Sequence, residues 1–235
     1  MFNVSVKVLE LVNSDDEKKI RFEAMKTILQ DIAKANKPLV FKGGSALMFF
    51  YQLDRFSEDL DFDAVKKTDI FNLLSKRYPV SLAKDTDTTK RYKVDIGLSK
   101  PLKVEVSFRK RSLDDFQNFS GINVYTVNSI FKQKLNAMEN RTIARDLYDV
   151  AFILDNYFSR LDDSFKEKAK SLLKDFDKLL EKYLTAFVDD ELIGESGFDK
   201  TEGRLKDVKQ KIFLKDNSVK LNLLFGKGKN KGLRR

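Results

Sequence analysis

The sequence contains no cysteine and no histidine among its 235 residues. Without cysteine, the chain forms neither a disulfide framework nor a thiolate metal site. Without histidine, it lacks the side chain on which most zinc sites and Ser-His-Asp triads depend. Any catalysis must therefore use carboxylates, lysine, arginine, serine, tyrosine or a bound metal ion.

The sequence also lacks a long apolar run. No segment reaches the length of about 20 apolar residues that a membrane-spanning helix needs. Residues 1–13 lack the basic start and apolar block of a secretory signal peptide. We therefore expect a soluble, cytoplasmic protein that has no membrane partner.

Positive charge is plentiful: Lys and Arg number 45 against 36 Asp and Glu, which gives a net charge of +9. With 42% hydrophobic residues, the chain can bury a core and form one or two domains. A basic excess of this size favours polyanionic partners, nucleic acid first. The alternative is that the basic residues only keep the surface soluble.

The most informative stretch, residues 41–63, begins with a glycine pair and reads FKGGSALMFFYQLDRFSEDLDFD. The apolar run before Gly43 and Gly44 predicts a strand that turns sharply into a helix near Ser45. Glycines adopt positive φ and let the backbone approach a ligand. The free N–H groups of a first helical turn bind phosphate. The stretch therefore predicts a phosphate-binding turn, although a plain turn is the ordinary alternative.

The same stretch ends with alternating apolar and acidic residues, in which Leu60 and Phe62 separate Asp59, Asp61 and Asp63. On a strand, this alternation places the apolar side chains on one face and the carboxylates on the other. Crowded carboxylates repel one another unless a cation lies between them, and Mg²⁺ prefers oxygen ligands. Asp59 and Asp61 are therefore candidate metal ligands, the alternative being a solvated strand edge.

GGSAL, followed by Arg55, Ser57 and the DLDFD run, resembles the signature of nucleotidyltransferase toxins of the AbiEii/AbiGii type. That family belongs to the polymerase-β-like nucleotidyltransferase superfamily, whose hallmark is Gly-Ser followed by Asp-x-Asp. The resemblance covers roughly residues 41–154. A phosphate-binding turn followed by metal-binding carboxylates is also what nucleotidyl transfer needs.

A β-hairpin is predicted over residues 92–108, where two alternating segments flank the turn at 99–101. Glu105 points to the polar face of this hairpin, as Asp59 and Asp61 do on their strand. In the family that the chain resembles, a third carboxylate from a later strand completes the metal site. Glu105 in KVEVSF matches that position best, and Asp95 is the reserve candidate because it has the same parity. An exposed carboxylate without function is the alternative.

Residues 134–154 predict one helix with two faces. One stripe carries Lys134, Met138, Arg141, Arg145 and Asp149. Such a stripe is ordinarily a solvated face. Here the order Lys, Arg, Arg-Asp-x-Tyr-Asp is similar to the second signature of the same toxin family. The resemblance implies that Lys134 neutralises the triphosphate and that three further residues orient this lysine or bind the nucleotide, namely Arg145, Asp146 and Asp149.

The expected fold is α/β (α+β): a nucleotidyltransferase fold with a mixed sheet flanked by helices, followed by a mostly helical C-terminal part. We place the first domain at residues 1–125 and the second at residues 126–235. Within the second, residues 194–203 predict a polar loop, 205–214 a helix and 219–225 a short apolar element. The last residues, 226–235, are a basic, Gly-rich tail suited to phosphate contact.

The resemblance implies transfer of a nucleoside monophosphate from an NTP to an acceptor hydroxyl, with two Mg²⁺ ions as cofactors. Asp59, Asp61 and Glu105 would bind the metal, and Gly43, Gly44 and Ser45 the triphosphate. The implied acceptor is RNA, at the 3′ end of tRNA, which would make the protein a toxin with an antitoxin encoded nearby. Direct binding of that antitoxin is left open. The alternatives are an antibiotic-type small-molecule nucleotidyltransferase and a non-enzymatic nucleic-acid-binding protein.

Overall fold

The computed structural model describes residues 2–225, with side chains up to residue 214. The chain divides into two compact units, residues 1–141 and 142–235. The division lies after helix α5 (Val127–Asn140), whereas we placed the domain boundary before this helix. The reason is that α5 packs on α3 (Gly43–Phe50) and β7 (Ile122–Tyr125). Its N-cap is Thr126, whose hydroxyl accepts from the Ser129 amide.

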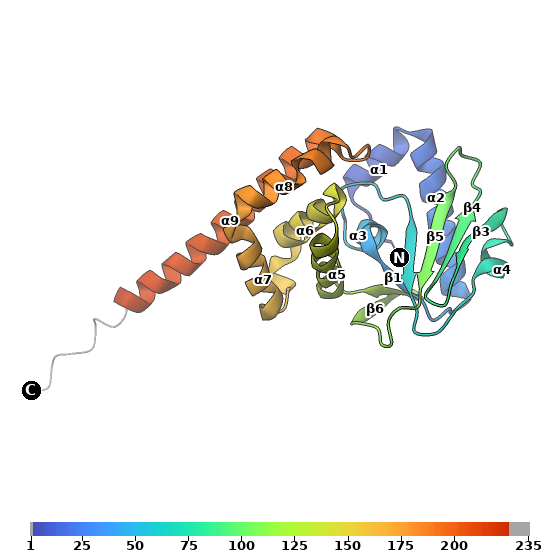
Figure 1. Ribbon diagram of the computed structural model, residues 1–235, viewed down its shortest axis with the longest axis horizontal. Coiled ribbons are helices and arrows are strands. Elements are labelled where there is room, and N and C mark those ends of the chain that lie inside the picture. Colours follow the sequence, from blue (N-terminus) through green and yellow to red (C-terminus); the bar gives the residue numbers. More distant parts are fainter. Residues whose placement is uncertain (1, 226–235) are drawn as a thin grey trace, which may run out of the picture. The chain divides into compact units, whose positions relative to one another are not determined.

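A seven-stranded mixed sheet forms the first unit, in the order β3-β4-β5-β2-β1-β7-β6 (Figure 1). This arrangement confirms the predicted fold class. The central strand β2 runs parallel to β5 and antiparallel to β1. The remaining strand bounds are β1 (Val40–Lys42), β2 (Leu60–Asp63), β3 (Val80–Asp85), β4 (Thr89–Val94), β5 (Leu102–Ser107) and β6 (Phe116–Phe119).

One face of this sheet is buried under aromatic side chains. Phe41 on β1 lies 5.1 Å from Phe62 on β2 and 6.5 Å from Phe49 on α3, between ring centroids. Phe49 in turn stacks at 5.1 Å on Phe22 of helix α2 (Asp16–Lys34). Each such burial contributes about 1.5–3 kcal/mol. Because strand side chains alternate, burying Phe41 and Phe62 directs Lys42 and Asp61 to the opposite face. Two more helices belong to this unit, α1 (Val6–Asn13) and α4 (Phe71–Leu74).

The second unit is helical and is organised around α6 (Ala144–Tyr157) (Figure 1). Nearly every residue of α6 from Ala144 to Leu154 is buried, and α6 packs against α8 and α9. A helix buried on all sides is the core of its bundle. The other elements are η1 (Phe158–Arg160), α7 (Asp163–Lys174), α8 (Phe176–Val188) and α9 (Gly194–Phe225).

The prediction of one continuous helix over residues 134–154 was wrong. The helix ends at Asn140, and the backbone is extended at Arg141 (φ −155°, ψ 158°) and Ile143 (φ −122°, ψ 125°). Thr142 and Ile143 are both β-branched and so have reduced helix propensity. The predicted stripe is therefore interrupted, and Lys134 and Asp149 lie on different helices.

The polar loop predicted for residues 194–203 is instead the start of α9. Its small residues serve packing: an added Cβ on Gly197 would lie 2.8 Å from the Ile193 Cβ. Thr201 is fully buried and donates a hydrogen bond of 2.7 Å to the Gly197 carbonyl. The predicted elements at 205–214 and 219–225 fall within the same helix. The basic tail, residues 226–235, lies outside the described residues.

Candidate functional site

The β1–α3 turn contains the predicted glycine pair. Gly43 adopts φ +76°, the left-handed region that favours glycine. A Cβ on Gly44 would lie 2.5 Å from Arg55 Nη2 and 3.0 Å from Ser57 Oγ. Lys42, the N-cap of α3, makes no side-chain capping hydrogen bond, so this side chain does not cover the N–H groups of the first turn. Both glycines are thus required by the shape of a turn that leads into a helix N-terminus.

Ser45 stands behind this turn and is only 3% exposed. Its hydroxyl donates to the main-chain carbonyl of Asp59 and lies 2.9 Å from the Ser57 hydroxyl. These contacts tie the loop before β2 to the start of α3. Ser45 therefore fixes the backbone of the first candidate metal ligand relative to the candidate phosphate-binding turn.

The predicted carboxylates converge on the polar face of the sheet. Asp61 on β2 is in direct register with Glu105 on the parallel strand β5, and Asp59 precedes it by two residues. An added Cβ on Gly43 would lie 3.9 Å from Asp61 Oδ2, so the turn reaches the same place. Burial raises the pKa of Asp61 above its ordinary value. The charge of Lys103 opposes this rise, the charges of Asp59 and Glu105 add to it, and the pKa stays raised. The three carboxylates are thus electrostatically coupled.

Two cations that the sequence analysis did not single out neutralise this cluster. Lys103 Nζ lies 2.6 Å from Asp59 Oδ2, and Arg91 Nη2 lies 2.7 Å from Glu105 Oε2. Burial would lower the pKa of Lys103, but its hydrogen bond to Asp59 and the nearby negative charges raise it above its ordinary value. The alternation of β4 and β5 could have revealed both residues, since Arg91 and Lys103 share the parity of Glu105.

Among residues 2–214, no group of three or more Asp, Glu, His or Cys side chains is arranged to hold a metal ion. The ion pairs give the physical reason, because Asp59 and Glu105 are turned towards Lys103 and Arg91. The donor set nevertheless fits Mg²⁺, which takes carboxylate oxygens. Asp61 and Glu105 are register partners on adjacent parallel strands, which lie about 4.7–4.9 Å apart in a sheet. A metal ion here would take the place of the two cations.

Asp95, the reserve candidate for the third carboxylate, lies away from this cluster. The hairpin itself forms as predicted, but β4 ends at Val94. The β4 residue opposite Glu105 is Arg91, four positions before Asp95. Asp95 Oδ1 instead accepts from the Gly97 amide at 2.9 Å in the exposed turn. The register thus favours Glu105 as the partner of Asp61.

Asp63 is the buried centre of a second polar cluster. It is 2% exposed, pairs with Lys42, and lies 3.2 Å from Lys110 Nζ. The Tyr125 hydroxyl donates to Asp63 Oδ2 at 2.9 Å. Burial and the charge of Asp63 raise the pKa of Tyr125, so this hydroxyl stays protonated and remains a donor. The sequence placed Asp63 on the polar face but gave no signal for Lys110 or Tyr125 as its partners.

Lys134 lies on α5, on the inner side of this helix. Phe131 and Met138, three positions before it and four after it, are both buried. Lys134 itself is half-buried. The prediction that Met138 belongs to a polar stripe was therefore wrong, and Lys134 does not lie on a solvated face.

The three predicted residues of α6 belong to the second unit. Arg145 Nε lies 3.0 Å from Asp190 Oδ2, and Asp190 also accepts from the amide of Leu192. Arg145 therefore joins α6 to the segment between α8 and α9. Asp146 and Asp149 are 1% and 0% exposed. Buried carboxylates are retained only where they have partners, so both are built into the unit and are not part of a solvated stripe.

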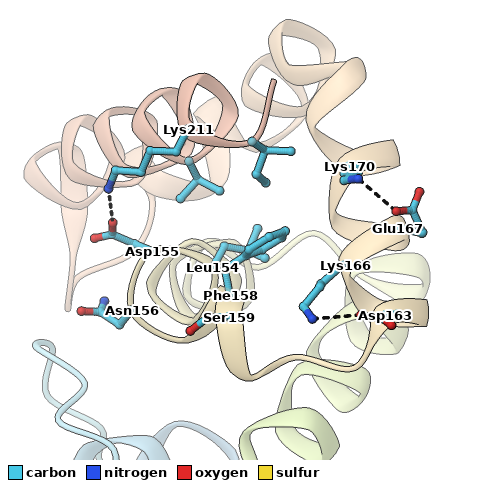
Figure 2. Close-up of a pocket in the computed structure, with 12 residues that line it drawn as sticks. Leu154, Asp155, Asn156, Phe158, Ser159, Asp163, Lys166, Glu167, Lys170 and Lys211 are labelled. Carbon is cyan, nitrogen blue, oxygen red and sulfur yellow. Dashed lines mark hydrogen bonds and ion pairs between the residues drawn. The ribbon is translucent and has the colours of Figure 1, made fainter. Parts of the chain in front are cut away.

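A cavity of about 430 Å³ also lies within the second unit, between α6, α7 and α9 (Figure 2). Its lining includes the apolar side chains of Leu154, Phe158, Val208 and Ile212. The lysines around it are paired with acids, as Figure 2 shows: Lys166 with Asp163 at 2.9 Å, Lys170 with Glu167 at 3.1 Å and Lys211 with Asp155 at 3.6 Å. The charges of the lining cancel, so the cavity presents no net charge to a ligand.

The chain is similar to a known protein family and to several solved structures. A family model described as nucleotidyl transferase AbiEii toxin, type IV toxin–antitoxin system, matches residues 27–217. A Helicobacter pylori protein described as a candidate nucleotidyltransferase is 30% identical, with a TM-score of 0.71, over 85% of this chain and 96% of that chain. JHP933 from Helicobacter pylori is 28% identical, with a TM-score of 0.69, over 94% and 99% of the two chains.

A more distant likeness shows the fold alone. MenT4, a nucleotidyltransferase toxin from Mycobacterium tuberculosis, is 16% identical, with a TM-score of 0.50, over 86% of this chain and 87% of that chain. No curated protein sequence matches the chain significantly. Within the described part of the chain, no helix combines the length and apolarity needed to cross a membrane.

Proposed function

Because the chain belongs to the AbiEii nucleotidyl transferase toxin family of type IV toxin–antitoxin systems, we propose that it transfers a nucleoside monophosphate from an NTP to a hydroxyl of RNA. The proposed acceptor is the 3′ end of tRNA, and the transfer depends on Mg²⁺. One observation carries the proposal: Asp61 lies in register with Glu105 and beside the Gly43 turn. The proposed metal ligands thus lie beside the turn proposed to bind phosphate.

Asp59, Asp61 and Glu105 would hold the metal. Bound Mg²⁺ would supply Lewis-acid stabilisation of the negative charge on the attacking and leaving oxygens. The carboxylates themselves would orient the site, since Ser45 fixes the main chain of Asp59 and the sheet register fixes Asp61 against Glu105. Lys103 and Arg91, released from their carboxylates, would be free to neutralise phosphate.

The turn of Gly43, Gly44 and Ser45 would receive the triphosphate through its main-chain N–H groups. Lys134 would neutralise the charge that develops as pyrophosphate leaves. Arg145, Asp146 and Asp149 belong to the second unit, where Arg145 would support α6 through Asp190.

The acceptor assignment is supported by charge. A net charge of +9 suits a long polyanion and is of little use for a small antibiotic acceptor. The family implies an antitoxin partner, and the proposal does not require the antitoxin to touch the toxin. The reaction would take place in the cytoplasm, where NTPs and tRNA are found.

The test is incubation of the protein with each radiolabelled NTP and total cellular RNA, with Mg²⁺ or with EDTA. We expect the wild-type protein to label tRNA-sized RNA with Mg²⁺ but not with EDTA. The Asp61→Asn variant should give no label under either condition. Label that survives EDTA or Asp61→Asn would refute the metal assignment. Label in small molecules but not in RNA would favour an antibiotic-type transferase, and RNA binding without any NTP turnover would favour a non-enzymatic binding protein.

A further inference from the structure

A cavity of about 340 Å³ in the first unit has no part in the functions assigned so far. It lies between the segment that follows β5 and one side of α5. Its lining consists of Lys110, Arg111, Ser112, Asp114, Lys132, Gln133 and Asn136. All of these side chains are polar or charged, so the cavity suits a polar ligand.

The charge of this cavity is positive. Three cations line it against one carboxylate, Asp114, which binds Lys110 at 2.8 Å and Lys132 at 2.9 Å. Asp114 therefore holds two ammonium groups close together. In the cavity of the second unit, by contrast, each lysine has its own acid. The net charge of about +2 on this lining favours an anion.

Two groups of the lining have hydrogen-bonding capacity to spare. The Nε2 of Gln133 is buried and has no hydrogen-bond partner within the described part of the chain. Leaving a buried donor without an acceptor costs about 1–3 kcal/mol. The Arg111 guanidinium is exposed and forms no ion pair among the described residues. Donors of this kind call for a ligand rich in acceptor oxygens, such as a phosphate group.

The cavity is connected to the carboxylate cluster through Lys110 and Asp63. Lys110 Nζ lies 3.2 Å from Asp63 Oδ2, and Asp63 follows Asp61 by two residues on the same face of β2. Two residues along a strand span about 6.4–6.8 Å. A ligand at the cavity therefore lies next to the transfer centre without overlapping it.

The cavity is also distinct from the position proposed for the triphosphate. Lys132 and Asn136 each lie two residues from Lys134, which is about 200° around an α-helix. The cavity and Lys134 therefore occupy opposite sides of α5. A phosphate bound in the cavity is therefore not part of the triphosphate that Lys134 is proposed to contact.

We propose that this cavity binds a backbone phosphate of the RNA acceptor close to its 3′ end. The inference rests on the proposed function for the identity of the acceptor. The phosphate bonds to Arg111, Lys132 and the Gln133 amide, while Lys110 links the subsite to Asp63. Gln133 makes this a built subsite and not merely a basic surface.

The test measures binding without catalysis, using a short fluorescein-labelled single-stranded RNA that ends in CCA and a titration of each NTP. The variants are Arg111→Glu/Lys132→Glu and Gln133→Leu. The control is Lys19→Glu/Lys76→Glu, which has the same charge change at exposed lysines that form no ion pair among the described residues. Thermal melting checks that every variant is folded.

We expect the Arg111→Glu/Lys132→Glu variant to weaken RNA binding on the order of tenfold or more, since a hydrogen bond to a charged group contributes about 1.5–3 kcal/mol. Its salt dependence should become shallower, by a slope of about 0.7 for each phosphate that the variant no longer neutralises. Gln133→Leu should weaken RNA binding several-fold at an unchanged charge. NTP affinity should stay at the wild-type value in both variants, and the control should bind RNA nearly as the wild type does.

Weakened NTP binding with unchanged RNA binding would overturn the subsite and place a nucleotide phosphate in the cavity. Equal losses in the control and the charge variant, or no effect of Gln133→Leu, would replace the subsite by a diffuse basic surface. Failure of the proposed function looks different. In that case the RNA would bind in the cavity, but no label from an NTP would enter it. If the variants label RNA with an unchanged KM for RNA, the proposed function would be supported and the proposed subsite would be refuted.

Discussion

At the scale of single residues, the candidate site contains a carboxylate, Asp61, whose ionised form is disfavoured in the folded protein. The raised pKa of Asp61 means that burial and its neighbours disfavour the ionised form in the folded protein. The charges of Lys103 and Lys42 offset part of this cost at Asp61. Perturbed pKa values of this kind are common at functional sites, where charged groups are held for binding or catalysis.

Asp61→Asn should therefore separate activity from stability. We expect transfer to fall on the order of 100–1000-fold or more, as when one preorganised electrostatic group is lost. Removing a disfavoured charge should leave the melting temperature unchanged or higher in metal-free buffer at neutral pH. A lower melting temperature together with full activity would contradict both the metal role and the electrostatic account.

Gly44→Ala tests the packing of the turn. The new methyl group would overlap the Arg55 guanidinium, which is itself buried. We expect lower activity and a lower melting temperature, measured by transfer assay and thermal denaturation. The control is Gly203→Ala in α9, where an added Cβ meets nothing within 4 Å. That change should stabilise the helix by about 0.5–1 kcal/mol.

At the scale of elements, the register between strands decides which residues meet. β5 carries Val104, Glu105 and Val106 in the predicted alternation, and its parallel pairing with β2 sets Glu105 against Asp61. The antiparallel pairing with β4 sets Arg91 against the same glutamate. A slip of one residue would move each of these side chains to the other face.

Glu105→Gln and Asp95→Asn test this register as a matched pair, since each neutralises one carboxylate of the hairpin. We expect Glu105→Gln to lose most of the transfer activity, because Glu105 lies against Asp61. Asp95→Asn should keep nearly full activity, because the Asp95 carboxylate accepts from the Gly97 amide in its own turn, away from Asp61. The same steady-state assay serves both, and the reverse order of effects would assign the third carboxylate to Asp95.

At the scale of the whole molecule, the basic excess is the property that bears on the acceptor. The net charge of +9 belongs to a chain in which many acids, such as Asp114 and Asp190, are already paired with cations. The remaining positive charge is available to a polyanion. Binding that neutralises phosphates releases counterions and so weakens with salt.

The KM for RNA should therefore rise steeply with salt concentration, while the KM for the NTP rises much less. We expect the logarithm of the RNA affinity to fall linearly with the logarithm of salt concentration, with a slope of about −0.7 per phosphate contacted in a single strand. Measuring both constants over a salt series checks this. Equal, shallow slopes for both substrates would count against a nucleic-acid acceptor.

The sequence by itself determined the local features of this protein. Alternation identified the acidic face of β2 and the hairpin of β4 and β5, because side-chain period follows directly from strand geometry. The glycine pair marked the β1–α3 turn, because only glycine adopts its φ readily. The motifs around them identified the family, which the comparisons confirmed.

Only the tertiary structure decided which partners each charge has. It paired Lys103 with Asp59 and Arg91 with Glu105, buried Asp63 with Lys110 and Tyr125, and ended α5 at Asn140. It also placed residues 194–203 in a helix, where Gly197 packs closely against Ile193. The physical reason is that ion pairs, burial and helix ends depend on residues distant in sequence, whose approach is set by sheet order and packing and not by local periodicity.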